Sequence, residues 1–234
     1  MAYEKKIVAF IDVLGFKNKT DTTNPDQKHP IHLNLLNIKS FIDQLNNFYD
    51  QMDDHKKIKS HRFSDSCMFS APPEALEYLL DVLHRMQLHF ASRDFFLRGA
   101  ITYDYIYDHE GFFYGRALNT AYKLESSVAV YPRIIFDKKA FNSIDDVVNL
   151  KSPEAEDVPS YKRDLRRTHL KKDFDGNICI DFFRQSPYTP EFHEIFGWYD
   201  HDKTLDAIFK NITKNIRKYK NQPNLPVSYT HLTL

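Results

Sequence analysis

The sequence predicts one α+β domain, a ferredoxin-like βαββαβ sandwich in which helices pack on one face of an antiparallel sheet. Three observations lead to this prediction. Strand-like and helix-like segments alternate in that order along the chain. Hydrophobic residues make up 42% of 234 positions and aromatic residues 15%, which is enough to bury a core. No internal repeat is visible along the chain.

The first strand and the first long helix are predicted between residues 6 and 52. Residues 6–13 (KIVAFIDV) are mostly β-branched or aromatic, which is typical of a buried strand. Residues 20–30 are polar and hold two prolines, which indicates a loop. Apolar side chains recur at helical spacing over residues 31–52, which predicts an amphipathic helix.

A hairpin and the second helix follow. Residues 57–63 and 67–71 are short strand-like runs, and the Ser-Asp-Ser tripeptide at 64–66 between them is typical of a turn. Pro73 favours a helix start, and an apolar stripe continues to about residue 92. Residues 95–107 are predicted to form the next strand.

The second half of the chain predicts shorter elements. They are an aromatic run bracketed by glycines at 111–115, a helix at 116–126, a strand at 133–136, an irregular insertion at 143–168, a turn plus strand at 174–183 and a helix at 203–219. Residues 1–220 are expected to form a single domain. Residues 221–234 show no core pattern and are expected to be a disordered or non-native tail.

Composition excludes several classes of protein. Lys plus Arg and Asp plus Glu are each 32, so no strong basic field attracts nucleic acid. The two cysteines, Cys67 and Cys179, lie in apolar runs and are expected to be small buried residues. No apolar stretch is long enough to cross a membrane and the N-terminus resembles no signal peptide, so a cytoplasmic location is expected.

Two acids stand out. Asp12 lies in an otherwise apolar strand, where an unpaired charge is costly to bury, and Asp65 lies at the hairpin tip. If the strands are neighbours in a βαββ sheet, the two carboxylates converge at one edge. Together with a backbone carbonyl they form a hard oxygen site suited to Mg²⁺ or Mn²⁺. The turn at residues 14–16 can offer backbone N–H groups to a phosphate.

Four segments resemble, in order, sequence blocks of the class III nucleotidyl cyclases, the adenylate and guanylate cyclase catalytic family. They are residues 10–16 (FIDVLGF), 62–66 (RFSDS), 97–101 (LRGAI) and 115–126 (GRALNTAYKLES). The last block is the longest and the most specific. The resemblance spans a little over half of the chain and implies that family's catalytic fold and a phosphorus-oxygen lyase activity.

The resemblance also implies a metal site and a phosphate site. Asp12 and Asp65 would hold two Mn²⁺ or Mg²⁺ ions, assisted by the Val13 carbonyl. Backbone N–H groups of the following turn would contact the triphosphate, and these belong to Leu14, Gly15 and Phe16. Lys171 or Lys172 would hold the terminal phosphates.

A further pair of residues would act on the reacting sugar and phosphorus. Asn119 would orient the ribose and Lys123 would stabilise the transition state; their spacing of four places them on one helix face. In the family each site forms across a head-to-tail homodimer, with metal and phosphate residues from one copy and base pocket, amide and cation from the other. Two residues depart from the family's pattern. Ser64 replaces a hairpin glycine, which is tolerable if the Ser64 backbone is not left-handed. Lys123 replaces an arginine, which keeps the charge.

The expected base-binding positions match neither purine cyclase. The residue four before Asp65 is His61 and the residue three before Gly115 is Phe112. With the pattern's other aromatic residues these would fill a pocket that favours a smaller base; the set is Phe10, His61, Phe63, Phe112 and Tyr114. In this the chain is similar to the Pycsar pyrimidine cyclases, bacterial antiphage enzymes whose cyclic nucleotide activates a separate effector.

The predicted activity is therefore conversion of UTP to 3′,5′-cyclic UMP and pyrophosphate. Cyclic CMP from CTP, or a purine cyclase with an unusual pocket, are alternatives. A rival from another class is an inactive cyclase-like module that senses nucleotides. A third rival is a nucleic-acid binder that uses the basic cluster at residues 162–172. The acidic run before this cluster favours a solvated or phosphate-binding loop instead.

Overall fold

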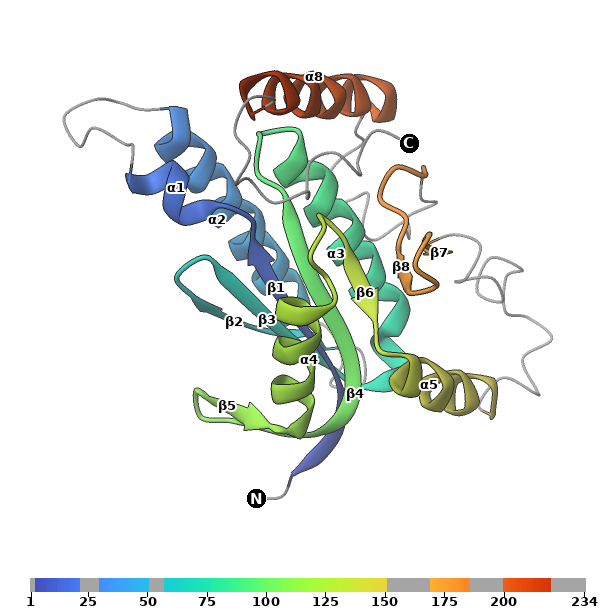
Figure 1. The fold of residues 1–234 in the computed structure, drawn as a ribbon. Coiled ribbons are helices and arrows are strands. Elements are labelled where there is room, and N and C mark those ends of the chain that lie inside the picture. The colour runs from blue at the N-terminus through green and yellow to red at the C-terminus, as the bar shows by residue number, and fades with distance from the viewer. Residues whose placement is uncertain (1–2, 22–29, 51–56, 151–168, 186–199, 220–234) are drawn as a thin grey trace.

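The computed structural model describes residues 3–21, 30–50, 57–150, 169–185 and 200–219 (Figure 1). Its centre is an eight-stranded sheet in the order β2-β3-β1-β4-β6-β8-β7, with β5 paired to β4. The strands are β1 Glu4–Val13, β2 Lys59–Phe63, β3 Ser66–Ala71, β4 Leu97–His109, β5 Phe112–Gly115, β6 Ile134–Phe136, β7 Leu170–Lys172 and β8 Ile178–Ile180. The order β2-β3-β1-β4 is that of a ferredoxin-like βαββαβ unit, so the predicted α+β fold is confirmed.

Two details of the predicted sandwich are wrong. The sheet is mixed, because β6 runs parallel to β4 while the other pairs are antiparallel. Helices also cover both faces: Figure 1 shows α4 (Arg116–Ser127) crossing in front of β1 and β4, with α3 (Leu76–Ala91) behind the sheet. The continuous apolar run of β1 is the physical reason, since a strand that alternates apolar and polar residues buries only one face.

The side chains of β1 divide between these two layers. Ile7, Ala9 and Ile11 join the main core, which α2 (Pro30–Asp50), α3 and α8 (His201–Tyr219) cover. Val8 lies on the opposite face and packs with Ala117 of α4. The Thr102 hydroxyl also donates to the Ala117 carbonyl at 3.0 Å, which ties α4 to β4.

Several local predictions need correction. Part of the predicted irregular insertion is helical, since α5 spans Lys138–Leu150; residues 151–168 lie outside the described residues. Strand β7 was not predicted. The remaining short helices are α1 Phe16–Asp21 and the 3₁₀ turn Pro73–Ala75. Most of the predicted loop at 20–30 and the predicted tail at 221–234 also lie outside the described residues, and the domain bounds stay a prediction.

Two composition-based expectations bear on the structure. Cys67 and Cys179 are both buried free thiols, as predicted. Burial raises the pKa of Cys67 to about 11 and that of Cys179 to about 12, so neither is a reactive thiolate. Within the described ranges, no helix has the length and apolar character that a membrane span requires.

Candidate active site

The end of β1 and the β2–β3 turn bring Asp12 and Asp65 together. Asp12 pairs in register with Ser66, the residue after Asp65, and accepts a hydrogen bond from the Ser66 hydroxyl at 3.2 Å. The pKa of Asp12 is raised, first by burial and then by the charge of Asp65, although Arg98 and Ser66 act in the opposite direction. Two carboxylates therefore share one half-buried edge of the sheet.

Arg98 and Glu125 complete this acidic edge, and neither was assigned a role from the sequence. Arg98 lies opposite Asp12 across β1 and β4, with its Nη2 atom 3.3 Å from the Asp12 carboxylate. The same guanidinium forms an ion pair with the buried Glu125 of α4. Burial raises the pKa of Glu125 to about 7 against the effect of Arg98. Both residues lie in segments that resemble the cyclase blocks, which was the available signal.

The donor set at this edge fits a divalent cation. Among the residues that the structure describes, no three His, Cys, Asp or Glu side chains gather around one possible metal position. Asp12 and Asp65 instead form a carboxylate pair whose mutual repulsion a cation would relieve, and carboxylate and carbonyl oxygens are the ligands that Mg²⁺ and Mn²⁺ prefer. Val13, whose carbonyl is the expected third ligand, is the last residue of β1.

The turn after β1 has one N–H group that is already used. The Leu14 N–H donates to the Phe96 carbonyl at 2.8 Å, so in this conformation it is not available to phosphate, contrary to expectation. Gly15 has φ +68° and faces open space, and Phe16 begins α1. The left-handed backbone at Gly15 explains why a glycine occupies this turn. Gly15 and Phe16 are left as the candidates for phosphate contact.

Ser64 has the left-handed backbone conformation that favours glycine, so the condition under which a serine would be tolerable there is not met. Its φ is +54°, which is left-handed and costs a residue with a Cβ atom about 1–2 kcal/mol. The hairpin therefore needs what a glycine supplies, and the serine is strained.

We expect Ser64→Gly to stabilise the protein by about 0.5–1 kcal/mol, because the relieved strain exceeds the glycine's extra entropy in the unfolded chain. For a domain of this size, thermal unfolding should occur about 1–4 °C higher. Ser66→Gly is the comparison, since Ser66 lies in the extended strand β3 and its replacement should lower the unfolding temperature. Equal shifts in both variants would contradict the assigned strain.

The sheet face that carries Asp12 also carries His61. Strand register places Phe63, Ser66, Asp12 and Arg98 in one cross-strand row. The next row, about 7 Å along the strands, holds His61, Met68, Phe10 and Ala100. Phe10 is nearly buried and meets the Tyr122 ring of α4 edge-on at 5.4 Å, whereas Phe63 is 77% exposed at the hairpin tip.

Only part of the predicted base pocket comes together. The ring that stacks on His61 belongs to Phe113, at 4.5 Å between centroids, and not to Phe112. Because successive side chains of β5 point to opposite sides, Phe112 and Tyr114 face away from Phe113. Phe112 is 66% exposed and Tyr114 stacks with Tyr107 at 5.1 Å. The assignment of Phe112 and Tyr114 to one pocket with His61 is therefore wrong within a single copy.

His61 has a partner that the sequence did not indicate. Its Nε2 atom lies 2.9 Å from the carboxylate of Asp108, whose side chain is 3% exposed. Asp108 also accepts a hydrogen bond from the Ser70 hydroxyl. These three residues lie on β2, β4 and β3, and they meet because β4 curves at its end toward β5 (Figure 1).

Asn119 and Lys123 lie together on the exposed face of α4, as their spacing predicts. Ala117, Ala121 and Glu125 form the buried face of the same helix. The amide and the amine therefore point away from the sheet that carries Asp12. One copy of the chain does not bring them to its own acidic pair.

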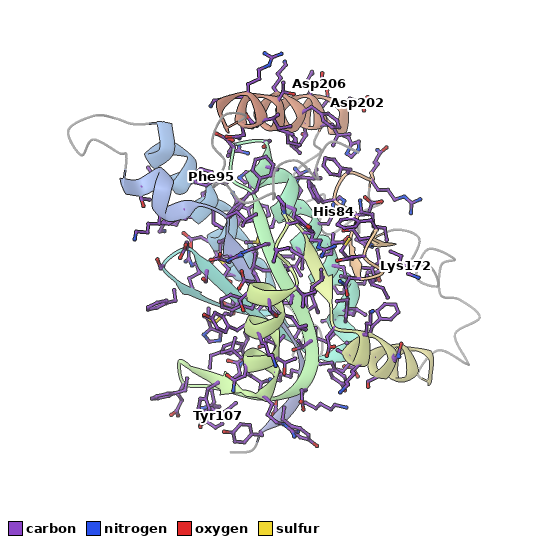
Figure 2. All side chains as sticks on the ribbon, viewed as in Figure 1. His84, Phe95, Tyr107, Lys172, Asp202 and Asp206 are labelled. Atoms are coloured by element: carbon purple, nitrogen blue, oxygen red, sulfur yellow. The ribbon has the colours of Figure 1, made fainter. Side chains whose placement is uncertain are left out.

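Lys171 and Lys172 lie on β7, at the far edge of the sheet. Figure 2 shows Lys172 beside β7, across the sheet from the β2–β3 hairpin. Four strand positions separate β7 from β1, which is roughly 19 Å. Lys171 also lies 3.5 Å from Asp181. The expectation that these lysines share a copy with the metal ligands is not met, because the fold holds them apart.

No protein-family profile matches this chain, and no curated sequence matches it. Solved structures that resemble it include the adenylyl cyclase CyaB from P. aeruginosa, with 16% identity and a TM-score of 0.47 over 63% of this chain and 84% of that one. A bacterial light-regulated adenylyl cyclase has 12% identity and a TM-score of 0.46, over 90% of this chain and 100% of that one. The monomeric guanylyl cyclase domain of the RhoGC fusion protein from the fungus Blastocladiella emersonii has 13% identity and a TM-score of 0.41, over 62% of this chain and 86% of that one.

Proposed function

We propose that this protein is a nucleotidyl cyclase that converts UTP to 3′,5′-cyclic UMP and pyrophosphate. The observation that carries the proposal is the convergence of Asp12 and Asp65 at the end of β1, beside the left-handed Gly15 turn. Carboxylates of this kind next to the backbone N–H groups of a turn suit a metal-bound triphosphate.

The chemistry divides among the residues of this chain. Asp12, Asp65 and the Val13 carbonyl would hold two divalent ions, which when bound make the ribose 3′-oxygen more nucleophilic and neutralise the leaving pyrophosphate. Gly15 and Phe16 bind phosphate oxygens through their backbone N–H groups. Neither a protein nucleophile nor a covalent intermediate is needed, because the 3′-oxygen attacks the α-phosphorus of the same molecule.

The remaining groups come from a second copy of the chain. Asn119 and Lys123 point outward from α4, so they reach a nucleotide held by Asp12 only if that nucleotide lies between two copies. There the Asn119 amide orients the ribose, and the Lys123 ammonium balances charge that develops at phosphorus. Lys171 and Lys172 lie far from the acids of their own copy, so they would hold the terminal phosphates from the second copy.

The base preference follows from the aromatic surroundings of His61. Phe113 covers one face of the imidazole, and Phe10 lies in the same row of the sheet, which narrows the space for a base. A pyrimidine suits this better than a purine, with UTP preferred and CTP the alternative. The cyclic product would act as a messenger for a separate effector in antiphage defence.

Incubation of the purified protein with each of the four NTPs and Mn²⁺ or Mg²⁺, followed by mass spectrometry, tests this proposal. Cyclic UMP as the main product is the expected result. Cyclic AMP or cyclic GMP alone would overturn the pyrimidine assignment. Tight NTP binding without any cyclic product would overturn the assignment of cyclase activity and support a nucleotide-sensing module.

A further inference from the structure

Asp108 is a buried acid held by three groups. Its carboxylate accepts hydrogen bonds from His61 Nε2 and from the Ser70 hydroxyl, and its backbone carbonyl accepts one from Lys59 Nζ at 3.3 Å. Burial alone would raise the pKa of Asp108, but the hydrogen bonds from His61 and Ser70 outweigh it and the pKa is lowered. Asp108 is therefore an ionised carboxylate, which can only accept hydrogen bonds.

An acceptor-only partner decides where the His61 proton lies. Because Asp108 cannot donate, the hydrogen between the two residues must be on Nε2 of the imidazole. In the neutral ring the other nitrogen, Nδ1, is then a hydrogen-bond acceptor. Without Asp108 either tautomer would be possible.

The β4–β5 hairpin, which carries Asp108, also fixes the orientation of the His61 ring. Phe113 pairs with Asp108 in the β4–β5 register and stacks on the His61 imidazole with 26° between planes. One face of the ring is covered and Nε2 is occupied. The atom left to meet a ligand is Nδ1.

Resting on the function proposed above, we propose that Asp108 is a positioning residue that makes His61 Nδ1 an acceptor for the N3–H group of uracil. Cytosine has a lone pair on N3, so two acceptors would face each other and CTP would be disfavoured. Uracil is thus selected over cytosine by one hydrogen atom, and the selection depends on a residue that does not touch the base.

The Asp108→Asn variant tests this directly. A side-chain amide can donate as well as accept, so it no longer holds the proton on Nε2, and a ring with its hydrogen on Nδ1 matches the N3 lone pair of cytosine. Affinities are measured with 3′-deoxy-UTP and 3′-deoxy-CTP in the presence of Mn²⁺, because these analogues bind but cannot cyclise. We expect the preference for the uracil analogue to fall about tenfold or more, the effect of one mismatched hydrogen bond.

Asp104→Asn is the matched control. Asp104 lies on the same strand and binds Arg116 at 3.0 Å without contacting His61, so this variant should keep the wild-type preference. Unchanged preference in Asp108→Asn would overturn the inference while the proposed function stands. Failure of the wild-type protein to bind either analogue would overturn the proposed function itself.

The tautomer can also be measured without nucleotide, in the wild-type protein. Imidazole nitrogen chemical shifts from NMR distinguish the two forms, and His61→Gln identifies the signal among eleven histidines. We expect hydrogen on Nε2 of His61. Hydrogen on Nδ1 with Nε2 bare would overturn the inference, whatever the protein catalyses and whether or not Asp108→Asn folds.

Discussion

The Asp65→Ala variant is expected to lose at least about 1000-fold in the rate of cyclic nucleotide formation, a change of roughly 4 kcal/mol in the activation barrier. The physical reason is that Asp65 supplies one of only two side-chain carboxylates at the proposed metal site. Its half-exposed position in the β2–β3 turn means that its removal deletes little packing, so the unfolding temperature should change by no more than a few degrees. Product formation and thermal unfolding are measured on the same preparation.

Asp43→Ala is the control for this variant. Asp43 is another acid near the hairpin, where it accepts a hydrogen bond from Arg62 of β2 at 2.9 Å, but it lies on α2 away from Asp12. It should keep turnover within about twofold, as an exposed ion pair usually contributes little. Turnover retained in Asp65→Ala would refute the metal assignment.

The Lys123→Ala variant is expected to lower kcat about 100- to 1000-fold and to change KM by less than about threefold. Lys123 is exposed on α4 and is proposed to meet charge that appears only as the phosphorus–oxygen bond breaks. An interaction formed only in the transition state affects turnover and leaves ground-state binding nearly unchanged. Steady-state kinetics with UTP separates the two quantities.

Lys123→Arg is the matched variant. It keeps the charge and adds a planar group that can donate two hydrogen bonds to phosphate oxygens, so it should retain most or all of the wild-type kcat. If Lys123→Ala instead raises KM as much as it lowers kcat, the residue binds the nucleotide throughout the reaction and the transition-state role is wrong.

The placement of Asp12 and Asp65 could be predicted because it depends on short-range signals. An acid in an apolar strand and an acid in a predicted turn need only one antiparallel pairing to meet, and the βαββ order supplies that pairing. The ion pairs of Arg98 with Asp12 and Glu125 depend on the exact register between β1, β4 and α4, which alternation alone does not determine.

The partner of His61 could not be predicted, for a related reason. Asp108 follows His61 by 47 positions and reaches it only because β4 curves toward β5 at its end. Whether Phe112 or Phe113 stacks on His61 depends on which face of β5 each side chain occupies. A shift of one residue in register exchanges the two faces of a strand. Likewise, helices were predicted on only one face of the sheet, because a strand-like composition does not by itself say that α4 packs against the second face of β1.

Mixing two inactive variants tests most directly whether the site is shared between copies. Asp12→Asn lacks the metal half of the site, and Asn119→Ala lacks the ribose half. If metal ligands and ribose ligand come from different copies, a mixed dimer holds one intact site. After subunit exchange at equal concentrations, activity should return to about a quarter of the wild-type value, because half of the dimers are mixed and each has one working site of two.

A mixture of Asp12→Asn with Asp65→Ala is the control, because both changes damage the same half and no pairing restores a site. Recovery in the first mixture and none in the second is the predicted result. No recovery in the first mixture, with exchange verified by mass spectrometry, would contradict a site built from the acids of one copy and the amide and amine of another.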